Sequence, residues 1–78
     1  MLNARQLLDL YYLPMRQRIL SLAADLDRLQ ISADGPQVMK NDPRLQELRL
    51  AVQILLETDP GRASRVQELL SDHTPPPR

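Results

Sequence analysis

The 78-residue sequence contains no cysteine, no tryptophan and no phenylalanine, and its only aromatic residues are two tyrosines. The absence of cysteine excludes disulfide bonds as a source of stability. The only histidine, His73, lies next to a proline-rich end, so no histidine and cysteine metal site is expected. A chain this short buries only about 60% of the surface that its unfolded form exposes. Because small proteins usually add disulfides, a metal or a partner chain, a partner chain is the remaining route to stability.

An excess of charge of one sign is also missing, since ten basic and ten acidic residues cancel at neutral pH. A dedicated nucleic-acid binder normally carries a basic excess or a basic patch, so this balance argues against nucleic acid as a partner. The longest unbroken apolar run, residues 10–13, is too short to span a membrane. No basic segment followed by an apolar run marks a secretory signal, and we therefore expect a cytoplasmic protein.

Apolar residues do recur at alternating spacings of four and three through the first 31 residues, which is the period of a helix packing lengthwise along other helices. These positions are Leu8, Tyr12, Met15, Ile19, Leu22, Leu26 and Leu29. The pattern predicts one long helix over about 4–31. Asn3 is a good N-cap, and Gln6 three residues later completes a capping box. The helix is expected to end at 32–36, because Gly35 can adopt a positive φ and Pro36 cannot continue a helix.

Pro14 conflicts with this helix, because a proline inside a helix removes one backbone hydrogen bond at a cost of roughly 3 kcal/mol. The helix could therefore start afresh at Pro14 or pass through it with a kink. The apolar spacing keeps its phase across the proline, with Tyr12 before it and Met15 after it. A true break has no reason to preserve this phase, so the sequence favours a kink.

Two shorter helices are expected over about 43–58 and 60–71, each introduced by an Asp-Pro pair, while residues 36–42 form a connection suited to an antiparallel turn. Residues Leu45, Leu48, Val52 and Leu55 give the first of them an apolar stripe. The predicted fold class is all-α, a small hairpin-like bundle of one long kinked helix and two shorter ones. Residues 1–72 are expected to form a single domain and residues 73–78 a mobile proline-rich tail, whose role as a recognition segment is left open.

Two stretches are apolar on nearly every side of a helix. Seven of nine residues are apolar in 7–15 and six of seven in 50–56. A helix that is apolar all round is normally buried all round, and two short helices cannot enclose a long one. We therefore expect a contact surface for another chain. The alternative is that both stretches face each other in a monomer with scattered exposed leucines. The candidate interface residues are Leu7, Leu10, Tyr11, Tyr12, Leu13, Met15, Leu50, Ile54 and Leu56.

No pattern of catalytic, cofactor-binding or metal-binding residues stands out. Asp9, Tyr12 and Arg16 lie near one another on a helix, but no nucleophile or base accompanies them. Asp25 and Asp27 point about 200° apart on a helix, so they cannot share an ion. No enzymatic activity, cofactor or small-molecule substrate is therefore expected.

The sequence thus predicts a non-enzymatic protein that acts by protein–protein association. Self-association into a helical bundle, most simply a dimer, is the first form, and docking on a larger protein as an accessory or adaptor subunit is the second. The alternative is a small regulatory nucleic-acid binder of the helix-turn-helix kind. Its second helix would be 61–71, with Arg62 and Arg65 near the start, where base-contacting residues usually lie.

Overall fold

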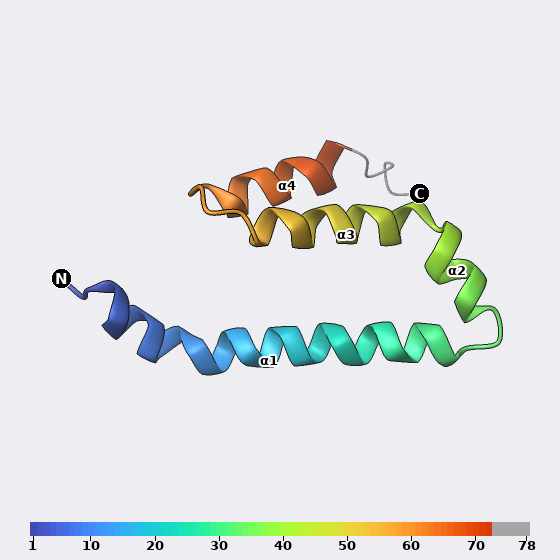
Figure 1. Ribbon diagram of the computed structural model, residues 1–78, viewed down its shortest axis with the longest axis horizontal. Coiled ribbons are helices and arrows are strands. Elements are labelled where there is room, and N and C mark those ends of the chain that lie inside the picture. The colour runs from blue at the N-terminus through green and yellow to red at the C-terminus, as the bar shows by residue number, and fades with distance from the viewer. Residues whose placement is uncertain (73–78) are drawn as a thin grey trace. The chain divides into compact units, whose positions relative to one another are not determined.

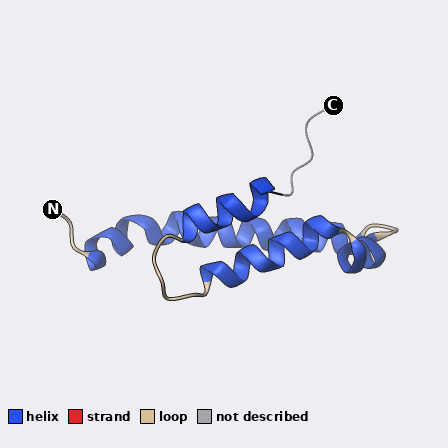
Figure 2. Ribbon diagram, turned by 90° about the horizontal axis from the view of Figure 1, so that it is seen from above, coloured by secondary structure: helices blue, strands red, loops and turns tan. Residues whose placement is uncertain are grey.

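The computed structural model describes residues 1–72, and in this range the chain folds into helices joined by short loops (Figures 1 and 2). The helices are α1 (Ala4–Ile31), α2 (Gly35–Asn41), α3 (Pro43–Leu55) and α4 (Arg62–Asp72). The predicted all-α class, with one long helix and shorter ones, is confirmed. No helix within residues 1–72 is both long enough and apolar enough to cross a membrane. The expected tail at 73–78 lies outside the described residues.

The chain forms two compact units, the first ending at Val38 and the second beginning at Met39. The boundary falls inside α2, so the first unit consists of α1 and the start of α2, and the second contains α3 and α4. The single domain expected over residues 1–72 stays a prediction.

Helix α1 begins as predicted, with a complete capping box. The Gln6 backbone N–H donates to Asn3 Oδ1 and the Asn3 backbone N–H donates to Gln6 Oε1, both at 2.9 Å. The helix is continuous through Pro14. Figure 1 shows the axis of α1 changing direction in its N-terminal part, which contains the proline. The expectation of a kink rather than a break is therefore confirmed.

The end of α1 differs from the expectation. The C-cap is Ser32 in an extended conformation, with its N–H bonded to the Leu29 carbonyl at 3.3 Å and its hydroxyl to the Arg28 carbonyl at 2.9 Å. Gly35 does not adopt a positive φ. It is buried, and a Cβ atom there would overlap the carbonyl oxygens of Leu29 and Gln30. Glycine is thus needed at this turn because the backbone approaches closely, and not because the turn requires a positive φ.

The connection expected at 36–42 is wrong, because most of it is the helix α2. Pro36 lies in the first turn of this helix, where a missing N–H costs nothing and the fixed φ favours the helix. The Val38 N–H donates to the Asp34 carbonyl at 3.1 Å and completes the first turn. Pro36, which was expected to follow the end of the first helix as part of a connection, therefore lies in the first turn of α2.

Helix α3 begins at the predicted Asp-Pro pair. Asp42 is the N-cap and accepts a hydrogen bond from the Arg44 N–H at 2.9 Å. The Arg44 guanidinium also donates to both carboxylate oxygens, at 3.0 and 2.9 Å. These hydrogen bonds lower the pKa of Asp42 from 3.8 to about 2, and the side-chain hydrogen bonds from Arg44 have the largest effect. The helix ends at Leu55, three residues before the expected Thr58.

The second Asp-Pro pair does not start a helix. Asp59 and Pro60 lie in the loop, and α4 begins at Arg62, two residues later than predicted. Gly61 has a φ of 87°, in the left-handed region that favours glycine, and its carbonyl accepts from the Arg65 N–H at 3.1 Å. The positive φ turns the chain after the proline, so the helical turn starts only beyond this glycine.

Helices α3 and α4 pack side by side and run in opposite directions (Figures 1 and 2). The buried apolar core in the described residues consists of Leu45 and Ala51, which are 6% and 8% exposed. Glu47 and Ile54, which share a face of α3 with Ala51, are half-buried. Leu48, Val52 and Leu55 of the predicted stripe remain exposed. The buried residues of α3 therefore match the predicted stripe only at Leu45.

Replacing Pro14 by alanine should stabilise α1, because it supplies an N–H for the Leu10 carbonyl. We expect a gain of up to about 3 kcal/mol, measured as a higher urea midpoint by circular dichroism. Pro36→Ala is the matched control and should give little change, because Pro36 lies in a first turn. A loss of stability in Pro14→Ala would show that the bend is needed for packing.

Replacing Gly35 by alanine should disrupt the turn between α1 and α2, because backbone atoms would have to move to make room for the Cβ atom. We expect a loss of about 1–3 kcal/mol in the free energy of unfolding. Gly61→Asn, at an open position whose positive φ asparagine tolerates, should cost much less. Equal stability of Gly35→Ala and the wild type would contradict the close approach.

The Asp42 cap should make α3 sensitive to acid. The pKa of Asp42 is lower in the folded chain than in the unfolded one, so its carboxylate stabilises the fold above about pH 4. This contribution is lost as the pH falls toward about 2. NMR titration of the Asp42 side-chain carboxyl carbon should give a midpoint near 2. Arg44→Gln should move this midpoint back toward 3.8, and an unchanged midpoint would refute the role of Arg44.

Candidate functional site

Helix α1 is the least covered helix of residues 1–72, because none of its 28 residues is buried and all but Leu7, Ala24 and Leu26 are exposed. Its backbone groups are satisfied within the helix and at its caps, whereas its apolar side chains have no packed layer of their own unit over them. Helices in proteins draw most of their stability from packing of an apolar face rather than from intrinsic propensity. The surface of α1 is therefore the candidate site.

One side of α1 carries the seven apolar positions spaced by four and three, from Leu8 to Leu29, here called the heptad face. At 100° per residue these positions fall within about 100° of the helix circumference. Ile19 is 70% exposed, and Leu26 is half-buried. This narrow, continuous stripe has the shape of a helix-packing seam.

A second apolar face lies roughly opposite the first and is here called the reverse face. Its members are Leu10, Leu13, Leu20, Ala24 and Ile31. Leu13 is 65% exposed and Ile31 is 82% exposed. The sequence signal for this face was present as a second series spaced by three and four, interrupted by Gln17 and Asp27. Within residues 7–15 the two series overlap, so this stretch is apolar on nearly every side of the helix.

The predicted interface residues divide among several surfaces. Tyr12 and Met15 belong to the heptad face, and Leu10 and Leu13 belong to the reverse face. The other predicted positions are half-buried Leu7 and exposed Tyr11 on the flank of α1, half-buried Ile54 on α3, and exposed Leu50 and Leu56 at α3 and its C-cap. The structure thus brings the α1 candidates together on one helix but on different sides of it.

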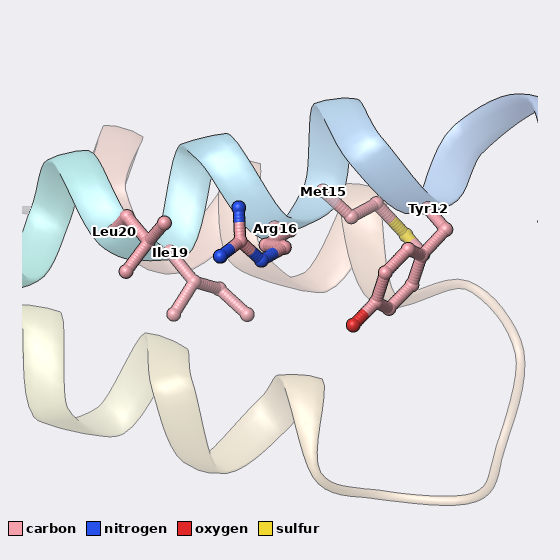
Figure 3. Close-up of a pocket in the computed structure, with 5 residues that line it drawn as sticks. All are labelled: Tyr12, Met15, Arg16, Ile19 and Leu20. Carbon is pink, nitrogen blue, oxygen red and sulfur yellow. The ribbon is translucent and has the colours of Figure 1, made fainter.

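A shallow hollow lies along α1 where the heptad face meets its polar edge (Figure 3). It is lined by Tyr12, Met15, Arg16, Ile19 and Leu20. Arg16 is the only charged residue of this lining. Among residues 1–72 no hydrogen bond or ion pair joins Asp9, Tyr12 and Arg16, the polar cluster considered from the sequence. The hollow has the chemistry of an apolar contact surface with one basic group beside it.

Metal-ligating side chains do not gather anywhere in the described range: no group of three or more histidine, aspartate or glutamate residues there could hold an ion. One acidic residue of α1, Asp25, instead forms an ion pair on the surface of the helix. Asp25 Oδ1 accepts from the Arg28 guanidinium at 2.9 Å, one helical turn away.

The two arginines considered as base-contacting residues bind the loop between α3 and α4. Arg65 pairs with the Glu57 carboxylate and donates to the Asp59 carbonyl at 3.1 Å. Arg62 donates to the Glu57 carbonyl. Both guanidinium groups therefore hold the connection of the antiparallel helices, which is a structural role that sequence spacing did not reveal.

Comparisons of this chain with models of protein families, with characterised proteins and with solved structures find no match. The surface of α1 is therefore the feature from which a function can be inferred.

Proposed function

We propose that this chain is a non-enzymatic cytoplasmic protein that acts by protein–protein association, with α1 as its association surface. Self-association into a helical bundle is the first form of this proposal, and docking on a larger protein as an accessory or adaptor subunit is the second. The observation that carries it is a 28-residue helix with apolar residues on two opposite faces and no buried residue.

The lengths of the helices support a contact with another chain. At 1.5 Å per residue, α1 is about 42 Å long and α3 is about 20 Å long. Neither α3 nor α4 is half as long as α1, and a second copy of α1 is a helix whose length matches this apolar surface.

The two forms differ in what they require. Self-association needs an apolar surface that is complementary to itself, and the heptad face is a repeating series of large apolar side chains that can pack against its own copy. Docking needs a separate protein with a matching groove. We give self-association priority because its partner surface is present on the chain itself.

Light scattering of the purified chain over a range of concentrations tests this function. We expect the mass to rise from one chain toward two. Ile19→Glu should abolish this rise, because burying an unpaired charge in an apolar interface is very costly. Ser21→Glu adds the same charge two residues away, outside both apolar faces, and should associate like the wild type.

The design keeps folding and association apart. Ile19 is largely exposed in the single chain, so Ile19→Glu should retain its helical circular dichroism while losing mass. A wild-type chain that stays a monomer at millimolar concentration would overturn self-association. Equal mass of Ile19→Glu and the wild type would remove the heptad face from the interface.

A further inference from the structure

We propose that the heptad face binds a second copy of α1 in antiparallel orientation, in the register that sets Arg18 opposite Asp25 of the partner subunit. This inference rests on the proposed function and names its partner and geometry. It is carried by the charges along the two edges of the heptad face.

The edges of the heptad face differ in charge. The first edge consists of the residues that directly precede Tyr12, Ile19 and Leu26. It carries Arg18 and Asp25, which are one heptad apart. The second edge consists of the residues that directly follow Leu8, Met15, Leu22 and Leu29. These residues are Asp9, Arg16, Ala23 and Gln30. Residues at such edges face the partner helix in a coiled coil and set its orientation and register.

Two antiparallel registers bring six of the seven apolar positions of the heptad face opposite one another. The first sets Ile19 opposite Leu22 of the partner subunit. Its edges then place Arg18 opposite Asp25 of the partner subunit, and two-fold symmetry repeats this pair. On the other edge, Arg16 meets Ala23 of the partner subunit. This register has two opposite-charge pairs and no like-charge pair.

The competing arrangements lack this complementarity. The second antiparallel register sets Ile19 opposite Met15 of the partner subunit. It brings Arg18 against Arg18 of the partner subunit and Arg16 against Arg16 of the partner subunit, and facing like charges are unfavourable. A parallel pair sets Arg18 opposite Ala23 of the partner subunit and Asp25 opposite Gln30 of the partner subunit, so it gains no ion pair.

The state of these groups in the single chain fits the first register. Within residues 1–72, Arg18 takes part in no ion pair, and its exposed guanidinium is available. Asp25 uses Oδ1 for Arg28, which is 2.9 Å away and holds the carboxylate on the helix surface. The Oδ2 atom of Asp25 remains for a second guanidinium.

The first register also accommodates the bend at Pro14. It pairs apolar positions from Tyr12 to Leu29, so only its outermost layer precedes the proline. The second register pairs positions from Leu8 to Leu26 and would place the bend further inside the contact. A straight contact along the unbent part of α1 therefore favours the first register, which the charges favour as well.

Disulfide cross-linking tests the register cleanly, because the chain has no native cysteine. Single variants Ile19→Cys and Leu22→Cys are mixed under mild oxidation, with one of them labelled with ¹⁵N so that mass spectrometry separates mixed from like pairs. We expect mixed cross-linked dimers well above the half that random pairing gives. Ile19→Cys alone should cross-link slowly, as should its mixture with Met15→Cys.

Each other result has a defined meaning. Rapid cross-linking of Ile19→Cys with itself would establish the parallel pair, and preferential pairing with Met15→Cys would establish the second antiparallel register. Either result would overturn this inference and leave association intact. Absence of any cross-link together with a monomeric mass in light scattering would overturn the proposed function as well.

Charge reversal provides an independent test of the ion pairs. Arg18→Asp and Asp25→Arg should each weaken the dimer about tenfold, because each change replaces two ion pairs by two like-charge contacts. Both changes in one chain should restore the wild-type dissociation constant. Arg49→Asp is the matched control, because it makes the same charge change at an exposed position of α3, outside the heptad face and its edges, and it should have little effect. Failure of the double variant to recover would refute the pairing of Arg18 with Asp25 of the partner subunit.

Discussion

The exposed apolar surface of α1 is the main physical constraint on this structure. Its backbone hydrogen bonds are complete through Asn3 and Gln6 at one end and Ser32 at the other, so the helix is locally well specified. An isolated helix is nevertheless only marginally stable in water, and large apolar side chains left in solvent give no packing energy. Any cover over the apolar surface of α1 would therefore add to the stability of this helix.

The second unit also has few buried apolar residues, and polar contacts contribute to its stability. Leu45 and Ala51 bury little apolar area, and the chain adds polar contacts at the ends of its helices. Asp42 and Arg44 fix the start of α3, while Arg62 and Arg65 hold the loop that leads into α4. Such exposed pairs each contribute modestly, but they restrict the loop conformations and so favour the antiparallel pairing of α3 and α4. Arginines that resemble a nucleic-acid contact set in the sequence are thus committed to folding.

The parts of the fold that sequence reasoning predicted are those fixed by local chemistry. The capping box at Asn3, the passage through Pro14 and the start at Asp42 each depend on residues within one helical turn. The errors arose where one residue type has two uses. Pro36 is a residue type that can follow the end of a helix, and here it lies in the first turn of α2. Gly35 allows close backbone approach instead of adopting a positive φ. Similarly, the spacing of apolar residues predicts the heptad face and contains the reverse face as a second series, which Gln17 and Asp27 interrupt.

The reverse face limits which assemblies α1 can build. A two-fold contact through one face closes on itself, because each copy uses up the surface of the other. If both opposite faces bound further copies, every new chain would expose a fresh face, and the assembly would grow without a fixed end. A finite complex therefore requires that Leu10, Leu13 and the rest of the reverse face bind no further copy of the chain. A substitution that let the reverse face bind another copy would convert a closed pair into a growing fibre.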